Sequence, residues 1–234
     1  MASEPTHMYQ EVREIPAAVE RLLSAGNASI TSAAALAREA NPNYFISIAR
    51  GSSDHAASFL KYASELVLQR PMASVGPSVS SIYGVNLDAR GAFGIAVSQS
   101  GQSPDIVRLT ESLGENGALT VAITNDGRSR LAGVSNATLE LHAGAELSVA
   151  ATKTFVTSLV AGLWFLAELK QDEELIAAIR KLPQALDRAT QCDWSAAAEA
   201  IDGRSLFTIV RGPSWAISNE AALKFKETCL IHAE

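Results

Sequence analysis

The 234-residue chain has little cysteine, no excess of cationic side chains and no long apolar stretch. Its two cysteines, Cys192 and Cys229, are too few for a disulfide framework or a thiolate metal site. Nineteen Lys and Arg against 25 Asp and Glu give a net charge of −6, which argues against nucleic acid as a partner. No segment reaches the roughly 18 apolar residues of a membrane span, and the N-terminal residues lack a signal-peptide core. We therefore expect a cytoplasmic protein with no metal, no cofactor, no nucleic-acid partner and no membrane partner.

Hydrophobic residues make up 47% of the chain, which is enough for a sizeable core. From residue 44 onward, short apolar runs alternate with helical patterns. Apolar strands separated by helices are typical of a parallel sheet covered on both faces. The predicted fold class is thus α/β, with a doubly wound parallel five-stranded sheet. We expect strands at residues 44–49, 72–75, 91–97, 118–124 and 137–141, and helices at 54–69, 104–113 and about 152–169.

Helical patterns flank the predicted sheet on both sides. Before it, apolar spacing predicts two short helices or one helix kinked at Pro16, followed by an Ala-rich helix over residues 31–40. After it, residues 172–202 are charged and helical, which we interpret as a connector between domains. The predicted divisions are N-terminal helices (1–40), a first domain (41–171), the connector (172–202) and the beginning of a second domain (203–234).

A short internal repeat supports the second domain. A strand, the motif Arg-Gly-x-Ser and a helix occur at Arg50 and again at Arg211, 161 residues later, with the second strand expected over residues 206–210. Only 23 residues follow Arg211, and residues 229–234 continue an apolar helical pattern without a cap. We therefore expect a truncated second domain. The alternative is a chance recurrence of a common strand–Gly–helix junction.

The strongest local signal is the serine loop, SQSGQS at residues 98–103, which joins a strand to a helix. Hydroxyls and the free N–H groups of a helix N-terminus form an uncharged anion site, aided by the helix dipole. Because the loop lacks lysine and a GxxxxGK[ST] motif, a small phosphomonoester suits it better than a nucleotide. The alternative is that these serines only cap the helix.

Two further loops follow expected strands. Gly51, Ser52 and Ser53 come directly after the strand at 44–49, and the carboxyl ends of parallel strands share one edge of a sheet. Both serine-rich loops therefore point to one crevice, unless this second one is only a polar turn. In the segment before the long apolar helix, Glu146 and Lys153 suggest either ligand contacts or a plain salt bridge or helix cap.

Charged side chains share one helical face near the end of the sequence. Glu220, Lys224 and Glu227 have i, i+4, i+7 spacing. Such a group can move a proton beside a carbonyl, but solvent-side ion pairs give the same pattern and are favoured by residue type alone. His55 lies close enough to the second serine loop to touch a ligand, and His232 falls one turn beyond the charged group; packed or surface histidines are the alternatives.

The segments SQSGQSPD, GAELSVAATKTF and NEAALKFKETCLIHAE occur in an order that resembles the sugar isomerase (SIS) family. Within that family, the resemblance is strongest to the isomerase half of glutamine–fructose-6-phosphate aminotransferase, or glucosamine-6-phosphate synthase. It covers about residue 44 to the end. The resemblance implies a SIS fold with the start of a second SIS domain, a hexose 6-phosphate substrate and a homodimer.

The resemblance also implies roles for individual residues. Glu227 matches the family's base that moves a proton between C1 and C2, and Lys224 and Glu220 match residues that support it. The family's ring-opening histidine and imine-forming lysine would lie beyond Glu234. Ser103 stands where threonine is common, and Ala151 where serine is usual. The implied substrate contacts are Ser52, Ser53, Ser98, Gln99, Ser100, Ser103, Val149 and Ala151.

The family's aminotransferase begins with a glutaminase domain bearing a nucleophilic cysteine, whereas about forty residues precede the first strand here and no cysteine precedes Cys192. We therefore expect a phosphosugar enzyme that resembles glucosamine-6-phosphate deaminases or aldose–ketose isomerases. One alternative is a non-catalytic phosphosugar sensor, which the short, non-basic N-terminal segment disfavours. The other is a deglycase for a sugar–amino-acid phosphate, which would use the same loops.

Overall fold

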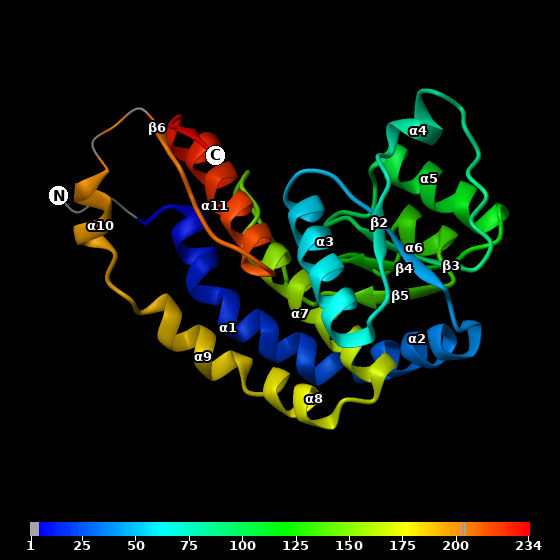
Figure 1. The fold of residues 1–234 in the computed structure, drawn as a ribbon. Coiled ribbons are helices and arrows are strands. Elements are labelled where there is room, and N and C mark those ends of the chain that lie inside the picture. The colour runs from blue at the N-terminus through cyan, green and yellow to red at the C-terminus, as the bar shows by residue number, and fades with distance from the viewer. Residues whose placement is uncertain (1–4, 202, 204) are drawn as a thin grey trace.

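A parallel sheet of five strands forms the centre of the protein, as seen in a computed structural model that describes residues 5–201, 203 and 205–234. The strand order is β2-β1-β3-β4-β5, so the chain moves outward from β1 to β2 and then returns to the other side of β1. The doubly wound α/β prediction is confirmed (Figure 1). The strands are β1 (Tyr44–Ile48), β2 (Met72–Ser74), β3 (Ala92–Val97), β4 (Leu119–Thr124) and β5 (Ala137–Glu140).

Each face of the sheet has its own apolar cluster, because successive strand side chains point to opposite faces. In β1, Phe45 packs in the first cluster and its neighbour Ile46 in the second. The first cluster is covered by α2 (Asn27–Ala40), α3 (Ser52–Ala63) and α7 (Lys153–Lys170), and the second by α5 (Pro104–Glu115) and α6 (Arg130–Val134). A short helix, α4 (Ser78–Ser81), lies beside α5.

The N-terminal segment is a single helix, α1 (His7–Ala25), which agrees with the one-helix alternative and not with two separate helices. Pro16 lies inside α1 and cannot donate the usual helical hydrogen bond to residue 12. Burial of Ile15, Val19 and Leu22 against the first cluster offsets that loss. The next helix, α2, begins at Asn27, four residues earlier than expected.

The predicted connector is helical: it comprises α8 (Glu173–Ile179), α9 (Leu182–Thr190) and α10 (Ser195–Ala200). Of these, α9 packs along α1 on the side away from the sheet (Figure 1). Among the described residues, no helix combines the length and apolarity that crossing a membrane would require.

Two expectations for the C-terminal part are wrong. The strand expected over residues 206–210 is only β6 (Ser205–Leu206), because its one pairing partner, β7 (His232–Ala233), supplies just two residues. The helix α11 (Ser214–Cys229) ends at a left-handed cap, Leu230, so the helical pattern expected through residue 234 stops at residue 229. His232 therefore lies on β7 and not on the charged face of α11.

The core depends on aromatic contacts in the first cluster. Phe93 lies 5.9 Å from Phe165 in a stacked pair and 6.1 Å from Phe45 in an edge-on pair, measured between ring centroids. All three side chains are fully buried. Because the sheet and α7 meet at Phe93, this side chain couples the strands to the helix that covers them.

Phe93→Ala should lower the free energy of unfolding by about 3–5 kcal/mol, because it leaves a cavity between sheet and helix. Urea denaturation followed by circular dichroism measures this change. Phe207→Ala is the matched control, since Phe207 is 68% exposed and its truncation should change stability by less than about 0.5 kcal/mol. Equal losses in the two variants would contradict the assigned core.

Candidate functional site

The strand order reverses between β1 and β3, and the loops that follow these two strands diverge there. In open parallel sheets, ligands bind beyond the carboxyl ends of the strands at such a reversal. The loop after β1 is joined to the first turn of the helix at residues 104–115 by an ion pair between Arg50 Nη1 and Asp105 Oδ2, 3.3 Å apart. The sequence did not predict this pair, since 55 residues separate its members and no periodic pattern links them.

Glycine shapes the serine loop. Gly101 has a φ of +62°, and a Cβ at this position would lie 2.1 Å from Ser129 Oγ. The carbonyl of Gly101 also accepts a hydrogen bond from the Leu131 amide at 3.0 Å. Only glycine can therefore bring the serine loop this close to the start of α6.

The hydroxyls of the serine loop are not explained by helix capping alone. Ser103 occupies the N-cap position of α5, but its side chain makes no capping hydrogen bond. Ser100 Oγ accepts from the Gln102 amide at 3.2 Å, inside the loop itself. Ser98 is buried, whereas Gln99 and Ser100 are exposed at the tip. The loop therefore presents polar groups at the carboxyl edge of the sheet, where the predicted anion site would lie.

The other expected serines lie in a helix rather than in a loop. Helix α3 begins at Ser52, two residues earlier than expected, so Ser52 and Ser53 form its first turn. It ends at Ala63 and continues as a π-helical turn, η1 (Ser64–Leu68). Gly51, with a φ of +60°, precedes the helix and turns the chain from β1 into it.

Residues 141–152, which we call the β5–α7 segment, have no regular secondary structure. Asn125 ties this segment to the serine loop. Its backbone amide donates to the Gln99 carbonyl at 2.9 Å, and its side chain bonds both the Gly144 carbonyl and the Ala143 amide at 2.9 Å. Three strand-end loops are thus joined through one residue that sequence reasoning missed.

Two residues of the β5–α7 segment were expected to touch a substrate. Val149 is fully exposed and Ala151 is partly exposed, so both are accessible for contact. Glu146 accepts hydrogen bonds from the Thr152 and Thr154 amides, both at 3.1 Å, and therefore caps α7. This contact favours the capping alternative for Glu146.

The charged residues of α11 share one face, as their spacing predicts. Lys224 Nζ lies 3.0 Å from Glu220 Oε1, an ion-pair contact rather than an aligned hydrogen bond, and 2.8 Å from Glu227 Oε2. The same ammonium lies 3.2 Å from Ser52 Oγ at the start of α3. The predicted base and its neighbours are thus held beside the first turn of α3. Glu227 is the most exposed of the three, with 36% of its side chain accessible.

His55 pairs with Glu220 and is not free. The distance between His55 Nδ1 and Glu220 Oε2 is 2.7 Å, and the Glu220 side chain is buried. Burial raises the pKa of Glu220, but its polar contacts with His55, Lys224 and Ser52 outweigh burial, so the pKa is lowered overall. The carboxylate is therefore kept ionised between α3 and α11.

A cavity of about 370 Å³ lies between α3 and α11, and His55 is part of its lining. Burial raises the pKa of Asp54 in its wall, and the charge of His55 only partly opposes that change. Its lining also includes Gly51, Asn219 and Lys226.

A model of the SIS domain family matches residues 40–168, more than half of the chain. The chain belongs to the SIS domain family. Over the full length of this chain, the sequence is 31% identical to glutamine–fructose-6-phosphate aminotransferase from Thermococcus kodakarensis. The match covers 40% of that enzyme. The chain thus spans about two fifths of the length of the curated relatives it matches.

Two solved structures are similar to this chain. A "putative phosphosugar isomerase" from Silicibacter pomeroyi DSS-3 has 55% identity and a TM-score of 0.95, with 98% of this chain and 71% of that chain covered. Glucosamine-6-phosphate deaminase from Thermotoga maritima has 19% identity and a TM-score of 0.76, covering 98% and 69%, which shows a shared fold alone.

Several expectations stay predictions. The roles of the substrate contacts and of the α11 residues are among them, as are the homodimer, the cytoplasmic location and the four-part domain division. The internal repeat is also untested, although Gly51 and Gly212 both have positive φ, at +60° and +67°, just before a helix.

The stability of the protein should depend on the ionisation of Glu220. A carboxyl whose pKa is lowered by folding stabilises the protein above its unfolded pKa, and this contribution is lost as the pH falls through the folded value. The free energy of unfolding should therefore decrease below a pH of about 4.5, the usual pKa of such a group. In Glu220→Gln the decrease should be shallower.

Urea denaturation from pH 6 to pH 3 measures how steeply the free energy of unfolding falls with pH in the wild type and in Glu220→Gln. Glu39→Gln, at an exposed site on α2, is the control and should keep the wild-type slope. Parallel slopes for wild type and Glu220→Gln would refute this role.

Proposed function

We propose that this protein binds a hexose 6-phosphate and acts as a glucosamine-6-phosphate deaminase or isomerase. The observation that carries the proposal is the position of Lys224, whose ammonium contacts both Ser52 and Glu227. It joins a proton-transferring carboxylate to the part of the sheet edge where the hydroxyl-bearing loops lie. The uncharged serine loop suits the phosphate, and the more exposed Glu227 suits the sugar carbons.

The chemistry moves two protons and needs no external oxidant. Glu227 removes the proton from C2 of the open-chain amino aldose, the electron pair forms the C1–C2 double bond, and the C1 carbonyl oxygen takes up a proton, which gives an enolamine. Return of the first proton to C1, with loss of a proton from nitrogen, gives a hydroxyl at C1 and a ketimine at C2, which water hydrolyses to fructose 6-phosphate and ammonia. With a 2-hydroxy substrate, the same transfers, with the C2 oxygen in place of nitrogen, would interconvert aldose and ketose.

Lys224 and Glu220 support this step electrostatically. The ammonium lies 2.8 Å from the Glu227 carboxylate, so it holds this side chain in place beside the first turn of α3. Glu220 holds the ammonium from the buried side and is itself held by His55. We therefore assign Lys224 and Glu220 a supporting role and Glu227 the role of base.

The first test is an assay of ammonia and fructose 6-phosphate after incubation with glucosamine 6-phosphate. Both products should form in equal amounts. Glu227→Gln should lower kcat by about 10²–10⁴, the usual contribution of a positioned base, and leave the Kd for the substrate near the wild-type value. Glu111→Gln, at an exposed position on α5, is the matched control and should retain full activity.

The products distinguish the alternatives. Interconversion of aldose and ketose phosphates without ammonia would favour the isomerase, and release of a free amino acid from a sugar–amino-acid phosphate would favour the deglycase. Tight binding without turnover of any of these substrates would favour the sensor. Full activity of Glu227→Gln would remove this residue from the mechanism.

A second test concerns the phosphate. Ser100→Ala and Ser103→Ala should each raise the Kd for glucosamine 6-phosphate about ten-fold or more, because each removes a hydrogen bond to a charged group. Ser24→Ala, which removes a hydroxyl bonded only to its own helix at the Glu20 carbonyl, is the control and should bind normally. Calorimetric titration measures all three. Unchanged binding in both serine-loop variants would place the phosphate elsewhere.

A further inference from the structure

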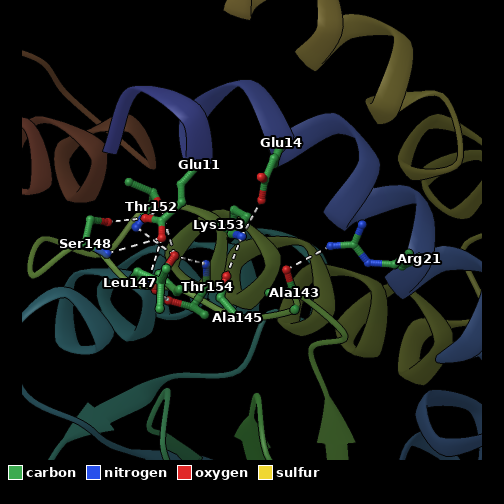
Figure 2. Close-up of polar contacts among 12 residues, drawn as sticks. Glu11, Glu14, Arg21, Ala143, Ala145, Leu147, Ser148, Thr152, Lys153 and Thr154 are labelled. Atoms are coloured by element: carbon green, nitrogen blue, oxygen red, sulfur yellow. Dashed lines mark hydrogen bonds and ion pairs between the residues drawn. The ribbon is translucent and has the colours of Figure 1, made fainter. Parts of the chain in front are cut away.

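The β5–α7 segment carries two of the expected sugar contacts, Val149 and Ala151, yet it forms neither a strand nor a helix of its own. A segment of this kind must be fixed by other groups if it is to present side chains in a defined place. Helix α1, more than a hundred residues earlier in the sequence, supplies these groups. Figure 2 shows Glu11, Glu14 and Arg21 reaching from α1 toward the segment.

Glu11 makes the central contacts. One carboxylate oxygen accepts hydrogen bonds from the backbone amides of Leu147 and Ser148, the second at 3.2 Å. The other oxygen accepts from the hydroxyls of Ser148 and Thr152, the latter at 3.2 Å. Glu11 is 5% exposed, so four donors from one segment surround a buried carboxylate.

Two more side chains of the same helix face complete the attachment. Arg21 donates to the carbonyls of His142 and Ala143, at 3.0 and 2.8 Å. Glu14 accepts from Lys153 Nζ at 2.6 Å, and the same ammonium donates to the Ala145 carbonyl at 2.6 Å. Lys153 is therefore committed to α1 and to the segment, which accounts for its burial.

A buried carboxylate is stable only when its charge is well solvated by donors. Burial raises the pKa of Glu11, but the hydrogen bonds from Ser148, Leu147 and Thr152 outweigh it, so the pKa is lowered overall. Donors of the β5–α7 segment thus stabilise the Glu11 carboxylate, and this carboxylate is the hydrogen-bond acceptor for the amides of Leu147 and Ser148. Removal of the carboxylate would leave these amides without a partner in a partly buried place.

We propose that Glu11 is a positioning residue for the sugar part of the site: by fixing the amides of residues 147 and 148, it places Val149 and Ala151 against the bound hexose. This inference rests on the proposed function, since it requires a sugar phosphate in the crevice. Glu11 itself touches no substrate. Its effect should therefore fall on recognition of the sugar and not on the phosphate, which the serine loop would hold.

Glu11→Ala tests the inference with two ligands, glucosamine 6-phosphate and inorganic phosphate. The Kd for the sugar phosphate should rise about ten-fold or more through loss of the ordered segment, whereas the Kd for inorganic phosphate should stay near the wild-type value. Hydrogen exchange at the amides of Leu147 and Ser148 should become faster, with the central strands unchanged. Glu20→Ala, an equal truncation at an exposed position of α1, is the matched control.

Glu11→Gln adds a rescue. Its carbonyl oxygen can still accept from both amides, and its NH₂ group can donate to the two hydroxyls after they rotate. Glu11→Gln should therefore recover most of the affinity for the sugar phosphate. If only the negative charge of Glu11 mattered, this variant would recover none of it. If Glu11→Ala does not fold, Glu11→Asp gives the same comparison, since a carboxylate shorter by one methylene cannot reach both amides.

The outcomes separate this inference from the function on which it rests. Wild-type affinity for the sugar phosphate in Glu11→Ala, or an equal loss for both ligands, would overturn the positioning role and leave the proposed function intact. If the wild-type protein binds neither ligand, the proposed function is rejected and the inference falls with it.

Discussion

Lys224 connects the two parts of the chain from which the candidate site is built. Its ammonium lies among Ser52 of the first domain and two carboxylates of α11, Glu220 and Glu227. Without this cation, two carboxylates would face each other at short range, and one of them is buried. Charge balance therefore helps to hold α11 against α3, at the position of the proposed base, Glu227.

The parallel sheet could be predicted from the sequence because its signals are local. Each strand is a short apolar run, and each is followed by a polar loop, so residues 44–49 and 91–97 already identified the edge of the sheet at which the serines lie. The shared face of Glu220, Lys224 and Glu227 also followed from helical spacing alone. The contacts that hold the loops could not be predicted in this way. Glu11 and Ser148 are 137 residues apart, and His55 and Glu220 are 165 apart, so no periodic pattern links them.

The incorrect expectations have one physical cause, which is that tertiary partners decide where an element ends. Residues 229–234 predicted a continued helix, but α11 ends at Leu230 and residues 232–233 pair with β6. The apolar run at 206–210 predicted a full strand, but a strand extends only as far as its neighbour. Ser52 was expected in a loop, yet the turn at Gly51 lets α3 begin there, which brings its hydroxyl to Lys224.

Different interactions support the sheet and the site. Apolar contacts such as those of Phe93 hold the strands and helices together, and substitutions that change the volume of these side chains affect the stability of the fold. The strand-end loops are held by polar groups from other elements: Asn125 for the serine loop, Glu11 for the β5–α7 segment and Lys224 for the first turn of α3. Because these groups contact the segments at the strand ends rather than the apolar clusters, their loss should disturb the geometry of the site more than the stability of the fold. If the proposed function holds, changes in these polar supports would alter which sugar the site accepts while the sheet stays the same.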